Sequence, residues 1–270
     1  PSANLKDILK SLCLKEFLGL SSRRLHSDLV FAKGMNYLEN VYHFNTILNY
    51  LGDPAISLYL GEIALMLAEP IKDLEVCAAI DSSGISTKRF AKKWLDAKHD
   101  FSNFKQYRKL HIVCGVRTNS IMAFKITNSN VNDSPMFESL VKDTVKRFPI
   151  KEILGDGAYC SRKNCELSLS LGLEAYLKPR KDARSRAKGA PAYSNMVRLF
   201  QQNLEVWKPK YHRRSNVETT FSMLKTKFDE STKGKTAITQ ENEIMCKVVA
   251  HNLCVLVHSM LQFGVKPGFW

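Results

Sequence analysis

Between Val76 and Leu177, short apolar runs alternate with longer amphipathic stretches, and this alternation limits the chain to an α/β fold. Arg117–Ser120 has the composition of a turn between two of the runs, which predicts an antiparallel hairpin. The runs with the length and composition of strands are 76–80, 110–116, 121–126, 150–154 and 173–177. We therefore predict a mixed five-stranded sheet with helices on both faces.

Two aspartates directly follow predicted strands. Asp81 comes at the end of the first run, and Asp156 comes just after the fourth, followed by Gly-Ala-Tyr159. Functional groups in α/β proteins often stand at the carboxyl ends of strands. If the first and fourth strands are parallel neighbours, both carboxylates lie at the same edge of the sheet.

A third acid, Glu218, lies in the stretch Tyr211–Lys225, which has the pattern of one amphipathic helix. On such a helix, Arg214, Glu218 and Lys225 would fall within roughly 40° of each other. The apolar stripe beside them predicts the buried face of the helix: Val217, Phe221, Leu224 and Phe228. For this stretch taken alone, a surface ion pair between Arg214 and Glu218, spaced i, i+4, is the simpler explanation.

The N-terminal part of the chain has a helical pattern throughout residues 5–69. Asp53 and Pro54 are suited to begin one of these helices, as N-cap and first helical residue. The pattern changes at Leu74, so we expect a small helical domain over residues 1–74 and an α/β domain over residues 75–270. The helical domain is a candidate for binding DNA ends, and a plain surface role explains its exposed loops equally well.

The net charge of +14 is concentrated in two stretches. Residues 178–214 carry 11 basic and 2 acidic side chains, and Lys88–Lys109 carries eight basic side chains against two acidic ones. Basic clusters in otherwise balanced sequence favour a polyanionic partner, most simply nucleic acid. Solvated loops are the alternative. Trp94 and Trp207 lie in or near these stretches and could stack on bases, although a packed core tryptophan is the preferred interpretation.

The seven cysteines form no CxxC pair, so we expect reduced thiols and no structural zinc site. No apolar run approaches the ~18 residues that a membrane span needs. The most apolar part, Val248–Leu261, is interrupted by polar residues. These observations favour a cytoplasmic protein with no membrane partner.

Three converging carboxylates would repel one another unless cations neutralise them. Ligand sets made only of oxygen suit Mg²⁺ or Mn²⁺. Two such ions about 3.5–4 Å apart can activate a water or a 3′-hydroxyl and stabilise the leaving oxygen of a phosphodiester. Arg214 and Lys225, beside Glu218, would then lie where a phosphate binds. The residues thus predict metal-dependent phosphodiester chemistry.

These residues resemble the motifs of the DDE-type insertion-sequence transposases of bacteria and archaea, which have a ribonuclease-H-like catalytic core. The resemblance covers roughly residues 75–262 clearly and residues 20–70 weakly. An Asp-x-x-Tyr motif is present at Asp156 and Tyr159, and further matches are Lys109-Leu-His111 and Asp133. The signature Tyr-x2-Arg-x3-Glu-x6-Lys is met in full by Tyr211, Arg214, Glu218 and Lys225.

The resemblance implies a ribonuclease-H-like fold in which Asp81, Asp156 and Glu218 are the catalytic residues and bind two divalent cations, Mg²⁺ or Mn²⁺. The expected contacts with double-stranded DNA come from the neighbouring basic and aromatic residues: Tyr211, Arg213, Arg214 and Lys225. The implied reaction is hydrolytic nicking at transposon ends, followed by attack of the freed 3′-hydroxyl on target DNA. The implied assembly is a homodimer that holds paired ends.

Three other functions are compatible with parts of this pattern. A metal-dependent nuclease of the same fold would cut DNA without joining it. A catalytically idle, transposase-derived protein would bind DNA and leave it intact. A basic scaffold that binds RNA is a third alternative, but the chain lacks an aromatic RNA-binding strand signature.

Overall fold

The computed structural model describes residues 3–87 and 107–269, so Trp94 and most of the basic stretch Lys88–Lys109 lie outside the described residues. The chain divides into two compact units, each assembled from separate segments. The helical unit comprises Pro1–Leu67, Gly84–Arg108 and Met223–Cys254. The sheet unit comprises Ala68–Ser83, Lys109–Ser222 and Val255–Trp270. The expected domain boundary after residue 74 stays a prediction.

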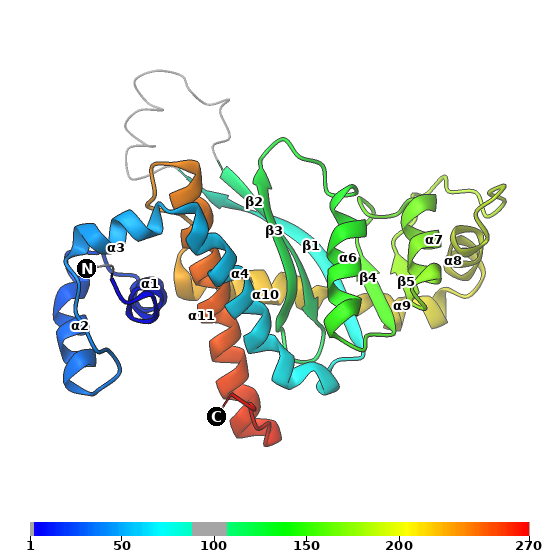
Figure 1. The fold of residues 1–270 in the computed structure, drawn as a ribbon. Helices are drawn as coiled ribbons and strands as arrows, with labels where there is room; N and C mark the ends of the chain where they lie inside the picture. Colours follow the sequence, from blue (N-terminus) through cyan, green and yellow to red (C-terminus); the bar gives the residue numbers. More distant parts are fainter. Residues whose placement is uncertain (1–2, 88–106, 270) are drawn as a thin grey trace. The chain divides into compact units, whose positions relative to one another are not determined.

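The five predicted strands form one sheet in the order β3-β2-β1-β4-β5 (Figure 1). Their bounds are β1 Cys77–Ser86, β2 Tyr107–Gly115, β3 Ile121–Asn128, β4 Glu152–Gly155 and β5 Glu174–Leu177. β4 pairs in parallel with both β1 and β5. The predicted mixed sheet with a ribonuclease-H-like arrangement is thereby confirmed.

A buried carboxylate holds the turn of the β2–β3 hairpin. Glu75 accepts hydrogen bonds from the backbone N–H groups of Arg117 and Thr118, at 3.1 and 2.6 Å. Burial raises the pKa of Glu75, and these hydrogen bonds oppose that rise. A Cβ at Gly115 would lie 2.2 Å from the Glu75 carboxyl carbon, so a larger residue there would displace the carboxylate from the turn. The turn was predicted from its own residues, but its buried partner was not.

Helices lie on both faces of the sheet, as predicted. In Figure 1, α6 (Met136–Arg147) lies in front of the strands, where it packs on β3, and α10 (Ser215–Phe228) passes behind them. On α10, the Thr220 hydroxyl lies 3.2 Å from the Asn119 side-chain oxygen. Three more helices pack beside β5: α7 Arg162–Ser170, α8 Pro191–Gln202 and α9 Leu204–His212.

The helical unit contains four N-terminal helices, in the region that was predicted to be helical, and the first part of the long helix α11 (Ala237–Phe263). Their bounds are α1 Leu5–Leu18, α2 Leu25–Gly34, α3 Phe44–Leu51 and α4 Pro54–Ala68, and a short 3₁₀ helix, η1 Glu69–Leu74, follows. Asp53 caps α4 as predicted, because its side chain accepts a hydrogen bond from the Ala55 N–H at 2.9 Å. The buried Asn242 of α11 donates hydrogen bonds to the carbonyls of Leu51 and Asp53, which ties α11 to this corner.

The first strand is longer than predicted. β1 does not end at Asp81 but continues to Ser86, so this aspartate lies inside the strand. The Ser86 N–H donates to the Glu230 carbonyl at 2.9 Å, and the Ser86 carbonyl accepts from the Thr232 N–H at 2.8 Å. Residues 82–86 of β1 are mostly polar or small, so the apolar pattern did not predict this part of the strand. Its backbone hydrogen-bond partners come from a distant part of the chain.

The stretch Tyr211–Lys225 was predicted to be one helix, and this was wrong. It consists of the end of α9 and most of α10. α9 ends at His212 and α10 begins at Ser215, with Arg214 in the turn between them. The Arg214 N–H donates to the Tyr211 carbonyl at 2.9 Å, a tighter i→i+3 bond that interrupts the α-helical ladder. The predicted apolar stripe is nevertheless buried: Val217, Phe221, Leu224 and Phe228.

The expectation that no stretch approaches a membrane span was wrong. By length and composition alone, Pro54–Leu74 and Ala237–Phe263 are apolar enough to cross a membrane. Core helices of globular proteins pass the same test, and 61% of the apolar window in the second stretch is buried within the structure. These helices are weak support for a membrane location.

Candidate active site

The strand register places the two aspartates next to each other. Ile80 of β1 pairs with Gly155 of β4, so the next residue along each strand is the aspartate. Parallel neighbours lie about 4.8 Å apart, which brings Asp81 and Asp156 to the same edge of the sheet. The Asp81 carboxylate accepts from the Ser82 N–H at 2.8 Å, and the Asp156 carboxylate accepts from the Ala158 N–H at 2.9 Å.

Arg214 joins the third acid to this pair. Its Nη1 lies 3.3 Å from Asp81 Oδ2, and its Nη2 lies 2.5 Å from Glu218 Oε1. The i, i+4 ion pair with Glu218 was predicted, whereas the second ion pair, with Asp81, was not. One guanidinium therefore spans a strand carboxylate and a helix carboxylate.

The electrostatics of Asp81 show that the three acids influence one another. Burial raises the pKa of Asp81 to about 6, and the negative charges of Asp156 and Glu218 act in the same direction. The Ser82 N–H and the Arg214 guanidinium oppose this rise in pKa. Such a shifted carboxyl group beside other acids is typical of functional sites.

Tyr211 lies beside the same group. Its ring stacks on Trp207, with centroids 4.3 Å apart, and the Arg214 guanidinium carbon lies 5.8 Å from its centroid. Burial raises the pKa of Tyr211, and the charges of Asp156 and Asp81 contribute to the rise. Trp207 is only 3% exposed, which confirms the packed-core interpretation of this tryptophan.

One of the predicted DNA contacts lies apart from the acids, and another belongs to the other compact unit. Arg213 Nη2 lies 2.5 Å from Glu152 Oε2, at the start of β4, whereas Asp156 follows the other end of that strand. Lys225 belongs to the helical unit, where it lines a cavity of about 560 Å³ together with other residues, among them Lys227, Lys233 and Lys247. The structure thus brings together Asp81, Asp156, Glu218, Arg214 and Tyr211, and it does not bring Arg213 to them.

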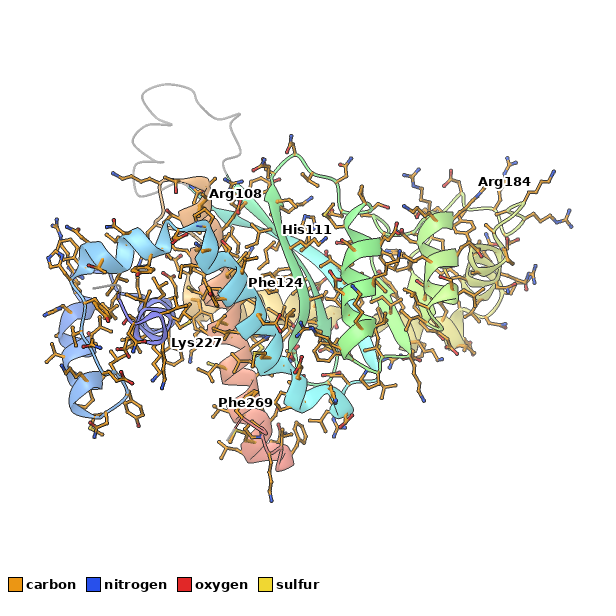
Figure 2. All side chains as sticks on the ribbon, in the orientation of Figure 1. Arg108, His111, Phe124, Arg184, Lys227 and Phe269 are labelled. Carbon is orange, nitrogen blue, oxygen red and sulfur yellow. The ribbon has the colours of Figure 1, made fainter. Side chains whose placement is uncertain are left out.

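A second polar cluster adjoins Asp81 through Ser82. The Ser82 hydroxyl donates to Asp133 Oδ1 at 2.7 Å, and Lys109 Nζ lies 2.8 Å from the same oxygen. The buried His111 (Figure 2) places its Nδ1 3.4 Å from Asp133, and burial lowers its pKa. Lys109, His111 and Asp133, which all matched the family pattern, therefore lie together beside Asp81. Ser82 was not among the predicted site residues, although its position directly after Asp81 was a usable signal.

The donor set suits a hard divalent cation, because it consists of carboxylate oxygens only. Within residues 3–87 and 107–269, however, no three acidic, histidine or cysteine side chains come together closely enough to hold a metal ion. The Arg214 guanidinium instead pairs with two of the three acids. The residue types therefore fit a cation, while in this arrangement an arginine balances their charge.

The comparison with protein families agrees with this geometry. A family model described as a transposase DDE domain matches residues 72–253, about two thirds of the chain. The matched range begins just before β1 and ends within α11. It contains all three acids of the site.

Proposed function

The chain belongs to the transposase DDE domain family, and from this premise we propose that it nicks DNA at transposon ends and joins the freed 3′-hydroxyls to target DNA. Proteins of this family act on DNA and generally use divalent metal ions. The observation that supports the proposal is that the strand register places Asp156 beside Asp81, while Arg214 forms ion pairs with both Asp81 and Glu218.

In the proposed reaction, Asp81, Asp156 and Glu218 hold the divalent cations, Mg²⁺ or Mn²⁺. When bound, two such cations supply charge stabilisation at the attacking and leaving oxygens of the phosphodiester. Arg214 and Tyr211 lie beside the acids, where they would orient the scissile phosphate. A guanidinium suits this role, because it can donate two parallel hydrogen bonds to a phosphate.

The remaining parts of the proposal concern the DNA and the assembly. Lys225 would contact the DNA backbone from the helical unit. Arg213 would do so only after leaving Glu152, with which it forms an ion pair. We further propose that two copies of the chain hold two transposon ends, and that the protein works on the nucleoid in the cytoplasm.

The test is cleavage of DNA that carries the sequences flanking the gene. Asp81→Asn, Asp156→Asn and Glu218→Gln should each abolish Mn²⁺- or Mg²⁺-dependent nicking, with far-ultraviolet circular dichroism and DNA affinity largely unchanged. Asp143→Asn is the matched control, because this exposed acid of α6 forms an ion pair with Lys146, three residues along the same helix. Full activity in any of the three site variants would overturn the assignment.

A second assay separates joining from cutting. Pre-cut ends with free 3′-hydroxyls, mixed with a supercoiled plasmid and Mn²⁺, should yield joined products. Nicking without joined products would identify a nuclease. Binding that persists in EDTA, together with no cutting in Mn²⁺, would identify an idle DNA-binding protein.

A further inference from the structure

The ion pairs of Arg214 point to a role beyond phosphate contact. We propose that Arg214 is an internal counter-ion that keeps divalent cations off Asp81 and Glu218 until a DNA phosphate draws its guanidinium away. The inference rests on the proposed function, since it assumes that these acids bind metal. It makes metal binding conditional on DNA binding.

Arg214 and a metal ion would compete for the same oxygens. Arg214 engages Asp81 Oδ2 at 3.3 Å and Glu218 Oε1 at 2.5 Å through two different nitrogens. A Mg²⁺ ion would need carboxylate oxygens at about 2.0–2.1 Å. A guanidinium in contact with both acids would repel that ion and occupy its place, so the two cations exclude each other.

The position of Arg214 allows it to change partners. It lies in the turn between α9 and α10, so its side chain can swing without breaking either helix. The side chain of Glu218 is 58% exposed, and an exposed ion pair contributes little stability. The cost of releasing this acid is therefore small.

A phosphate offers the guanidinium a better partner than the two acids do. Arginine binds phosphate with two parallel hydrogen bonds, whereas here it makes one ion pair with each of two separate acids. The centroid of the Tyr211 ring lies 5.8 Å from the guanidinium carbon. A DNA phosphate beside Tyr211 would therefore release both carboxylates at once.

Thermodynamic linkage makes the proposal quantitative. If DNA raises the affinity for Mn²⁺ by releasing Arg214, then Mn²⁺ must raise the affinity for DNA by the same factor. Couplings of this kind are typically about 5–150-fold. We expect about tenfold here, and the coupling should disappear when the arginine is removed.

The experiment is calorimetric titration of Mn²⁺ into the whole chain, without DNA and with a short duplex that lacks transposon ends. Arg214→Gln should bind Mn²⁺ about tenfold more tightly than wild type without DNA, and the duplex should then add nothing. In the wild type, the duplex should tighten Mn²⁺ binding about tenfold. Arg147→Gln is the matched control, because this arginine pairs with Glu69.

Wild-type or weaker Mn²⁺ affinity in folded Arg214→Gln would overturn the inference. Should that variant fail to fold, Arg214→Lys takes its place, because a lysine ammonium cannot span both acids in the same way and should give several-fold tighter binding; unchanged affinity there also overturns the inference. Tighter Mn²⁺ binding by Arg214→Gln, together with a wild type that does not cut DNA, would support the inference and contradict the proposed function. Cutting with unchanged Mn²⁺ affinity would do the reverse.

Discussion

At the scale of single residues, folding disfavours the ionised form of the Asp81 carboxyl group. Its folded-state pKa of about 6 lies above the ordinary value of 3.8, chiefly because the carboxyl group is buried. The protonated acid is thus favoured in the folded state. Its contribution to stability is fully present below pH ~3.8 and is lost as the pH rises through about 6.

Asp81→Asn should remove this pH dependence. Above pH ~6 in EDTA, we expect the variant to have a free energy of unfolding up to about 3 kcal/mol above that of wild type, because two pKa units correspond to about that energy. Loss of the ion pair with Arg214 reduces this gain. Urea denaturation at several pH values between about 4 and 8 measures the effect. A wild-type slope in the variant would show that Asp81 does not titrate in this range.

At the scale of elements, the tight packing of β4 between β1 and β5 decides where the acids lie. A Cβ at Gly155 would come within 2.8 Å of Leu177 Cδ2 and 3.0 Å of Ile80 Cγ2. Gly155 therefore allows the close approach of three strands immediately before Asp156. Gly155 lies directly before the Asp-x-x-Tyr motif, and the packing of the sheet explains why a glycine is there.

Gly155→Ala should destabilise the protein by about 1–3 kcal/mol, because the added methyl group overpacks the sheet. It should also reduce DNA cleavage more than the lost stability explains, since it shifts Asp156 relative to Asp81. Gly61→Ala, in α4 with open space around the new methyl group, is the control and should be neutral or slightly stabilising. Equal urea midpoints for the two variants would refute the packing argument.

The hairpin turn gives a second test at this scale. Glu75→Gln replaces one carboxylate oxygen with an amide group, which cannot accept a hydrogen bond from a backbone N–H. We expect a loss of about 1–3 kcal/mol, the usual cost of leaving a buried polar group unsatisfied. Chemical denaturation of the variant measures this loss. A stability equal to that of wild type would show that the Arg117 and Thr118 N–H groups find other partners.

At the scale of the whole molecule, the net charge of +14 should dominate the affinity for DNA. The loop before α8 carries exposed basic side chains against one acid, and Figure 2 shows Arg184 projecting from it. The exposed basic residues of this loop are Lys178, Arg180, Lys181, Arg184, Arg186 and Lys188.

Replacing Arg184, Arg186 and Lys188 with alanine should weaken DNA binding at every sequence. The slope of log affinity against log salt concentration should become shallower by about 0.9 for each DNA phosphate that the variant no longer neutralises. Fluorescence anisotropy over a range of salt concentrations measures the slope, and Lys142→Ala, on α6, is the control. An unchanged slope would mean that the loop is only a solvated surface.

Much of the architecture could be predicted because its signals are local. Short apolar runs, the turn at Arg117–Ser120 and the capping pair Asp53-Pro54 act within a few residues of each other, so periodicity and turn chemistry predicted the elements and their order. The two aspartates that directly follow apolar runs, and the glutamate on a later helix, could be identified as candidates for the same reason, although Asp81 lies within β1 and not after it.

The partners of individual side chains were decided only by the tertiary structure. Arg214 and Asp81 are 133 residues apart, Arg213 turns to Glu152 at the start of β4, and Ser86 pairs with a distant backbone. No local pattern encodes such choices, because a charged or extended segment accepts any complementary partner that the fold brings near. The sequence by itself therefore determined the elements and the candidate chemistry of this protein, while the packing of the sheet and helices decided which charges meet.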